Sequence, residues 1–272
     1  EWGCGFKSKK YAFGYYWEQV IFPLSEIKTI EDLQSYIWPD PDWYDYSQLP
    51  EIINKCGERA VNVGYSAVFT YHNYLRGLEQ SLVDPILEPE ITKEIITRIS
   101  SFFYEYHKRC FESVGKSISV TQVTDDWGSQ NGLITSPDVF TNFYKEPMRR
   151  AIKLAQSYNI APFHHDDGDC RALLPTFVDL GIKVLNPIQW RSGNWDLKGL
   201  KLDHGAEVCF HSGVDNQKTL PYGSPVEVSL EVKMLLDILA ADSTGFIIGP
   251  CHNLQPNTPI ENILALYKAA RI

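Results

Sequence analysis

The chain has 272 residues, of which 44% are hydrophobic and 22% are charged, and its formal net charge is −9. This composition excludes a disordered chain and predicts a protein that buries a substantial core. The negative charge argues against binding to nucleic acid or to an anionic membrane surface, because both partners demand clustered Lys and Arg.

The sequence carries no sign of a membrane or secretory segment. No apolar run approaches the ~18 residues of a membrane-spanning helix, and no charged-then-apolar leader is present. The six cysteines are scattered without a CxxC pair, a pattern typical of reduced thiols. These features predict a cytoplasmic protein. Because the chain opens at Glu1 without Met, we expect that an upstream segment has been removed or left out.

The first ~55 residues are rich in Trp and Tyr, as in "YAFGYYWEQVIFPL". Their alternation around Tyr15 to Phe22 predicts a short hairpin, and the Pro-Asp stretch from Pro39 to Asp42 is expected to end a short helix that begins near Thr29. An aromatic stripe of this kind is usually core packing, so we expect most of it to be buried.

From residue 59 onward, short apolar runs alternate with stretches of helical periodicity. The runs cover residues 59–71, 117–126, 160–169, 182–189, 206–215 and 245–253. The helical stretches cover residues 91–111, 137–158, 171–180, 226–241 and 259–270. This alternation predicts a parallel sheet with right-handed crossovers.

Polar residues follow five of these runs at their C-terminal ends. They are Asp125 and Asp126; His164, His165 and Asp167; Asn186 and Gln189; His211 and Asp215; and Cys251 and His252. In a (β/α)8 barrel all the strand ends converge on one mouth, whereas a doubly wound sheet gathers ligands around one switch point. Five successive polar strand ends therefore predict an α/β fold of the (β/α)8 TIM-barrel class.

The predicted organisation is a single barrel domain over residues 1–272. Residues 1–55 form an aromatic-rich hairpin and helix region, and residues 56–272 form the barrel. Only six or seven strands are counted, so we expect the first strand of the barrel to lie upstream of Glu1.

Four blocks of the sequence together resemble the uroporphyrinogen decarboxylase superfamily, which includes the corrinoid-dependent methyltransferases. They are "TDDWGSQNGLITSP", "HHDDGD" with the following "LLPTFVDLGIKVLNPIQ", "FHSGVDNQKTLPYGSPVEV", and "GPCHNLQPNTPIENILALY". The similarity runs from about Val120 to Ile272 in order and spacing. It implies a TIM barrel that lacks part of the superfamily's usual N-terminal segment.

The resemblance leaves two branches of activity. The decarboxylases clamp a tetrapyrrole with eight carboxylates through an arginine-rich N-terminal segment, which this chain lacks. Its strand ends carry only scattered arginines such as Arg76, Arg171 and Arg191, and the net charge is wrong for a polyanion. His252 does match a histidine of the decarboxylase cleft. The methyltransferases exchange a methyl group with a corrinoid carrier protein, and here the partner would supply the corrinoid because no DxHxxG signature occurs.

The methyltransferases that act on thiols bind zinc through a His-x-Cys element and a later Cys. The resemblance places His165 and Asp167 at the first element, and His252 or Cys251 at the last. Side chains at i and i+2 of an extended strand point the same way, so His165 and Asp167 can converge on one ion. Two nitrogens and one carboxylate satisfy a catalytic zinc, and such a set also admits iron, cobalt or manganese. A metal-free site that binds its substrate by hydrogen bonds stays open.

The remaining candidates are named by their positions at the strand ends. Catalytic roles are expected for Asp126, His165, Asp167 and His252, and substrate-binding roles for Asp125, Asn186, Gln189, His211 and Asp215. We expect His164 and Asp166 to face the opposite, outward side. Tyr71 and His72 are expected at the end of an earlier strand, and "TLPYGSP" is expected to be a mobile loop hinged at Gly223.

The sequence therefore predicts a methyltransferase that moves a methyl group between a corrinoid protein and a small acceptor, with assistance from zinc or another divalent metal. A metal-free lyase that decarboxylates a small acid and an inactive ligand-binding barrel are the alternatives. A homodimer is a further expectation, because the decarboxylase relatives form dimers.

Overall fold

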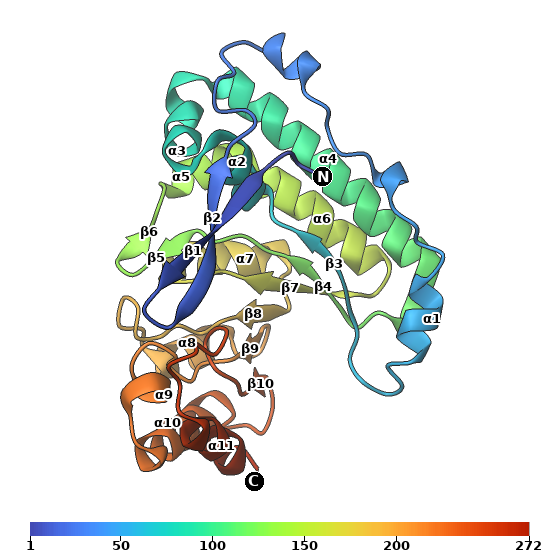
Figure 1. The fold of residues 1–272 in the computed structure, drawn as a ribbon. Coiled ribbons are helices and arrows are strands. Elements are labelled where there is room, and N and C mark those ends of the chain that lie inside the picture. Colours follow the sequence, from blue (N-terminus) through green and yellow to red (C-terminus); the bar gives the residue numbers. More distant parts are fainter. Residues whose placement is uncertain (272) are drawn as a thin grey trace. The chain divides into compact units, whose positions relative to one another are not determined.

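A computed structural model of the protein describes residues 1–271, which cluster into two compact units. The first unit comprises Glu1–Tyr11, Tyr15–Asp126 and Thr135–Pro162. The second comprises Ala12–Gly14, Trp127–Ile134 and the chain from Phe163 onward. Figure 1 labels the elements of both. Within residues 1–271, no helix combines the length and the hydropathy needed to cross a membrane.

The N-terminal segment forms a hairpin of β1 (Gly5–Tyr11) and β2 (Gly14–Ile21). A hairpin is thus confirmed, although it begins well before Tyr15. The side chains of Tyr15 and Trp17 are 69% and 71% exposed, so the expectation that the aromatic stripe is buried is wrong for these two residues. A two-stranded ribbon has too little surface around it to cover both faces.

The segment after the hairpin contains only short helical turns. They are the 3-10 helices η1 (Asp32–Ser35) and η2 (Pro41–Trp43), followed by α1 (Leu49–Asn54). The helix expected from Thr29 is therefore a single turn. The next 3-10 helix, η2, begins where the Asp40 side chain accepts a hydrogen bond from the backbone N–H of Asp42.

In the first unit, β3 (Asn62–Ser66) pairs in parallel with β4 (Val120–Val123). The crossover contains α2 (Val68–Arg76), α3 (Leu78–Leu87), the long α4 (Pro89–Val114) and the turn η3 (Gly115–Ser117). Helix α4 buries an apolar stripe that includes Ile95 and Ile99, and it packs against α6 (Lys145–Ser157), as Figure 1 shows.

One strand end predicted from the sequence is wrong. Tyr71 and His72 lie within α2, because β3 already ends at Ser66. Buried residues in α2 recur at Val68, His72 and Leu75, which is a helical period. That periodicity decides the structure of the segment even though its composition is β-branched and aromatic.

In the second unit, four parallel strands lie in the order β7, β8, β9 and β10, seen in yellow to red in Figure 1. Their bounds are β7 (Ala161–His165), β8 (Val184–Asn186), β9 (Cys209–His211) and β10 (Phe246–Ile247). The helices between and after them are η5 (Arg171–Leu173), α7 (Leu174–Leu180), α8 (Leu197–His204), α9 (Thr219–Tyr222), α10 (Pro225–Leu239) and α11 (Ile260–Ala269). Together with β3 and β4, these strands confirm all six apolar runs as parallel strands.

Apart from α6, the segment between β4 and β7 contains only short elements. A small hairpin of β5 (Gly128–Ser129) and β6 (Gly132–Leu133) is followed by α5 (Pro137–Val139), the π-helical turn η4 (Phe140–Tyr144) and α6. The predicted helix over residues 137–158 is confirmed, with a π-turn in its first half.

The segment expected to be a mobile loop after Asp215 is largely helical. Its first four residues form α9, and Ser224 caps α10 through a capping box with Glu227. The expectation of a loop over residues 219–225 is therefore wrong. The helix forms because the Asp215 carboxylate accepts hydrogen bonds from the backbone N–H groups of Lys218 and Thr219, which start it.

Candidate active site

Three side chains of the second unit converge after the ends of β7 and β10. His165, Asp167 and His252 each offer one ligand atom, and these atoms lie within 4.8 Å of one another. Oδ2 of Asp167 is 3.3 Å from Nε2 of His252 and 3.7 Å from Nε2 of His165. The three side chains are between 27% and 36% exposed, so a ligand can reach them from solvent.

The carboxylate of Asp167 is oriented by Gln189, which follows β8. Nε2 of Gln189 donates to Oδ1 of Asp167 at 2.7 Å, and Oε1 of Gln189 accepts from the backbone N–H of Gly168 at 2.7 Å. Both polar groups of the amide are therefore used within the protein. The second carboxylate oxygen, Oδ2, is the one that faces the two histidines.

The ring of His165 is oriented by Asn186 at the end of β8. Oδ1 of Asn186 lies 2.6 Å from Nδ1 of His165, and its Nδ2 lies 2.6 Å from Nδ1 of His211. Because a carbonyl oxygen only accepts, Nδ1 of His165 carries the proton and Nε2 keeps its lone pair. Burial, and then the neighbouring His165, lower the pKa of His211, which therefore stays neutral and accepts from Asn186.

The alternate residues of the same strand face the other way, as their spacing predicts. His164 and Asp166 are buried rather than outward, with His164 packed on Phe177 of α7 at 4.2 Å between ring centroids. Oδ1 of Asp166 accepts hydrogen bonds from the backbone N–H groups of Trp127 and Gly128. This carboxylate holds the β5 hairpin against the loop that carries Asp167.

Two glycines allow these loops to meet. A Cβ atom on Gly128 would lie 2.3 Å from the backbone oxygen of Asp167, so any other residue would push the hairpin away. Gly168 adopts φ +84°, and its own Cβ would lie 2.6 Å from the Ser129 oxygen. Gly128 and Gly168 are a sequence signal of this close approach, but the motifs considered above do not treat them as a pair.

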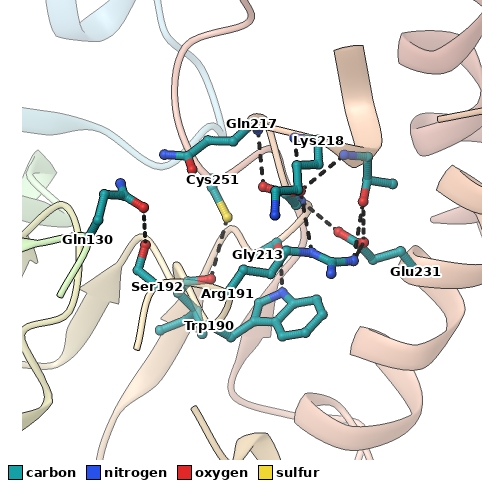
Figure 2. Close-up of polar contacts among 12 residues, drawn as sticks. Gln130, Trp190, Arg191, Ser192, Gly213, Gln217, Lys218, Glu231 and Cys251 are labelled. Carbon is teal, nitrogen blue, oxygen red and sulfur yellow. Dashed lines mark hydrogen bonds and ion pairs between the residues drawn. The ribbon is translucent and has the colours of Figure 1, made fainter. Parts of the chain in front are cut away.

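Cys251 lies outside the group of three. Its Sγ donates to the backbone oxygen of Ile188 at 3.4 Å, as Figure 2 shows, and burial raises the pKa of the thiol well above its usual range. A buried neutral thiol in a hydrogen bond is a poor metal ligand. Of the two adjacent candidates, His252 is the one that the geometry brings to His165 and Asp167.

Asp125 and Asp215, two further predicted site residues, hold backbone of their own unit. Asp125 and Asp126 belong to the first unit, where Oδ1 of Asp125 accepts from the backbone N–H of Thr70 at 2.8 Å. Burial raises the pKa of Asp125 well above its usual range. Asp215 is buried, and its carboxylate accepts three backbone N–H groups from residues 217–219. It fixes the loop after β9.

The donor set of the three residues fits a divalent metal. Two imidazole nitrogens and one carboxylate oxygen are a common catalytic zinc set, which leaves one position open for a substrate. The atoms behind two of these ligands are already held, His165 by Asn186 and Asp167 by Gln189. Such supporting hydrogen bonds are the usual companions of metal ligands.

Parallel strand and helix units with a polar site after the strand ends define a protein of the TIM-barrel class. The uroporphyrinogen decarboxylase (URO-D) family model matches residues 23–272. The chain therefore belongs to this family, whose fold is the TIM barrel, and the fold class predicted from the sequence is confirmed.

One solved structure supports the same fold, and a second gives a weaker match. The chain is similar to a methyltransferase from Methanosarcina mazei, with a TM-score of 0.73 and 19% identity over 98% of this chain and 75% of that chain. A 3-keto-D-glucoside 4-epimerase, YcjR, from E. coli in its apo form gives a TM-score of 0.40 and 13% identity over 84% of this chain and 88% of that chain. No curated protein matches the sequence.

Proposed function

We propose that the protein is a methyltransferase that moves a methyl group between a corrinoid carrier protein and a small acceptor. The observation that carries the proposal is the set of His165, Asp167 and His252, whose ligand atoms lie within 4.8 Å of one another. Membership of the URO-D family and the fold shared with a methyltransferase support it.

The proposed metal ligands and the residues that orient them have different roles. A divalent metal held by His165, Asp167 and His252 would act as a Lewis acid that lowers the pKa of an acceptor hydroxyl or thiol. Gln189 and Asn186 keep two of these side chains in place, so that the acceptor binds in one orientation. The open side of the site lets the acceptor's proton leave to solvent.

The transfer needs no reactant other than the acceptor and the partner's methylated corrinoid. The acceptor loses its proton, and its oxygen or sulfur forms a bond to the methyl carbon of the partner's methylated corrinoid. The carbon–cobalt bond breaks and its electron pair stays on cobalt, which passes from Co(III) to Co(I). The reverse reaction demethylates the product and returns the proton.

The experiment measures metal content and methyl exchange on the same preparations. We expect about one metal ion per chain in the unaltered protein, lost in His165→Ala, together with a fall of roughly 100-fold or more in methyl exchange from methylcobalamin. His204→Ala, which changes a histidine of α8 away from the three, is the matched control and retains both. Unchanged exchange in His165→Ala would contradict the proposal.

A metal-free lyase is the second candidate, and one contact favours it. Oδ2 of Asp167 lies 3.3 Å from Nε2 of His252, a pair that can hold and deliver a proton without a metal. Release of CO2 from a small carboxylated substrate by metal-stripped protein, lost in His252→Gln, would establish this activity in place of methyl transfer.

A further inference from the structure

Half of the residues that line the cavity beside Asp167 and His252 carry side-chain amides. The cavity has a volume of ≈ 500 Å³, within the usual range of small-molecule sites, and all its lining residues belong to the second unit. Six of these residues carry carboxamides: Gln130, Gln189, Asn216, Gln217, Gln255 and Asn257. A carboxamide can both donate and accept a hydrogen bond, and that of Gln189 is already used by Asp167 and Gly168.

Two of these amide residues are held by hydrogen bonds within the protein, Gln217 through its backbone and Gln130 through its side chain, as Figure 2 shows. The Asp215 carboxylate accepts from the backbone N–H of Gln217, and the backbone N–H of Asp215 itself donates to Oε1 of the buried Glu231 at 2.7 Å. Oε1 of Gln130 accepts from the hydroxyl of Ser192 at 3.2 Å. The cavity wall is therefore arranged before a ligand arrives.

Among the described residues that line this cavity there is neither Lys nor Arg, and His252 is the one side chain of this lining that can become cationic. Arg191, two residues after Gln189, is committed to other groups: its Nη2 donates to Oε2 of Glu231 at 2.6 Å, and its Nε lies 3.4 Å from Oδ2 of Asp215. Without a bound metal, a substrate carboxylate or phosphate would lose its hydration here and gain no ion pair with Lys or Arg.

The same lining residues include no Phe, Tyr or Trp. An aromatic substrate or a quaternary ammonium group would therefore find none of the large aromatic faces that usually bind it. A molecule with several hydroxyl groups, by contrast, can pair each of them with a carboxamide.

We infer that the methyl acceptor, with its methylated product, is an uncharged aliphatic compound carrying several hydroxyl groups, of the polyol or sugar class. The inference rests on the proposed methyl transfer for its chemistry. It rests for its recognition on the five carboxamides other than that of Gln189, with Gln217 as a residue that determines the charge preference.

The test uses two probes that differ at C6, where one sugar has a neutral hydroxymethyl group and the other a carboxylate. Isothermal titration calorimetry would compare 3-O-methyl-D-glucose with 3-O-methyl-D-glucuronate, and we expect the neutral sugar to bind at least about tenfold more tightly. Gln217→Arg supplies a cation to the cavity and should reverse this preference. Gln156→Arg, on the exposed surface of α6, is the matched control and should leave it unchanged.

Two outcomes would overturn the inference: tighter or equal binding of the glucuronate to the unaltered protein, and no measurable binding of the neutral sugar at millimolar concentration. Circular dichroism confirms that each variant is folded. Because binding needs neither corrinoid nor turnover, a protein that prefers the neutral sugar and shows no methyl exchange would contradict the proposed function alone.

Discussion

Asn186 connects two histidines that sequence reasoning could only place at neighbouring strand ends. Its carbonyl oxygen fixes His165 and its amide nitrogen reaches both His211 and the hydroxyl of Ser212. Losing this amide leaves the His165 ring free to rotate and to take the wrong tautomer.

Asn186→Leu is therefore expected to weaken metal binding by about 10- to 100-fold while the fold is retained. Competition with a fluorescent zinc chelator measures the affinity. Asn142→Leu, an exposed asparagine in η4, is the control and should bind metal as the unaltered protein does. Equal affinities in both variants would mean that Asn186 does not orient a ligand.

The residues that could be predicted are those with a periodic signal. His165 and Asp167 share a face because strand side chains alternate, and that geometry is local. The choice between Cys251 and His252 depends on the loop after β10, where a one-residue step reverses the direction of a side chain. The amides of Gln130 and Gln217 were missed because loop carboxamides have no pattern that distinguishes a cavity wall from an ordinary surface.

At the scale of elements, Glu231 of α10 holds the loop after β9 through three hydrogen bonds. It accepts from the backbone N–H of Asp215, from the hydroxyl of Thr219 and from Arg191. The sequence predicts a substrate-binding role for Asp215 and none for Glu231, whose position on a helix gives no indication of burial.

Glu231→Gln is expected to lower the free energy of unfolding by roughly 2 kcal/mol, because charged hydrogen bonds to a nearly buried carboxylate are weakened. Urea denaturation measures the loss. Asp237→Asn on the same helix removes an exposed partner of Lys233 and should cost at most about 0.5 kcal/mol. Equal losses in the two variants would show that Glu231 holds nothing specific.

At the scale of the whole molecule, the six parallel strands and the main helices were predicted from apolar runs that alternate with stretches of helical periodicity. The TIM-barrel class followed from the polar residues at successive strand ends. The sequence did not predict four helices, α2, α3, α8 and α9. They are short, or they overlap or follow apolar runs in the sequence that resemble strands. A single domain over residues 1–272 stays a prediction.

The stability of the first unit should depend on pH through two buried histidines. Burial lowers the pKa of His72 and of His107 from 6.5 to about 4. The unfolded chain therefore binds more protons than the folded one between these values, and the free energy of unfolding falls as the pH drops from about 6.5 toward 4. At pH 5 the loss is about 2 kcal/mol for each histidine.

Asp125 acts in the opposite direction, because burial raises its pKa and its protonation favours the folded chain. The contribution of one histidine is therefore isolated by substitution. His107→Leu should reduce the fall in unfolding free energy between pH 7 and pH 5 by about 2 kcal/mol relative to the unaltered protein, as measured by urea denaturation at both values. Phe111→Leu, which truncates the ring stacked on His107, should lower stability by a similar amount at the two pH values. If His107→Leu and the unaltered protein lose equal stability on acidification, the pKa of His107 is the same in the folded and unfolded chains, and burial does not control its charge.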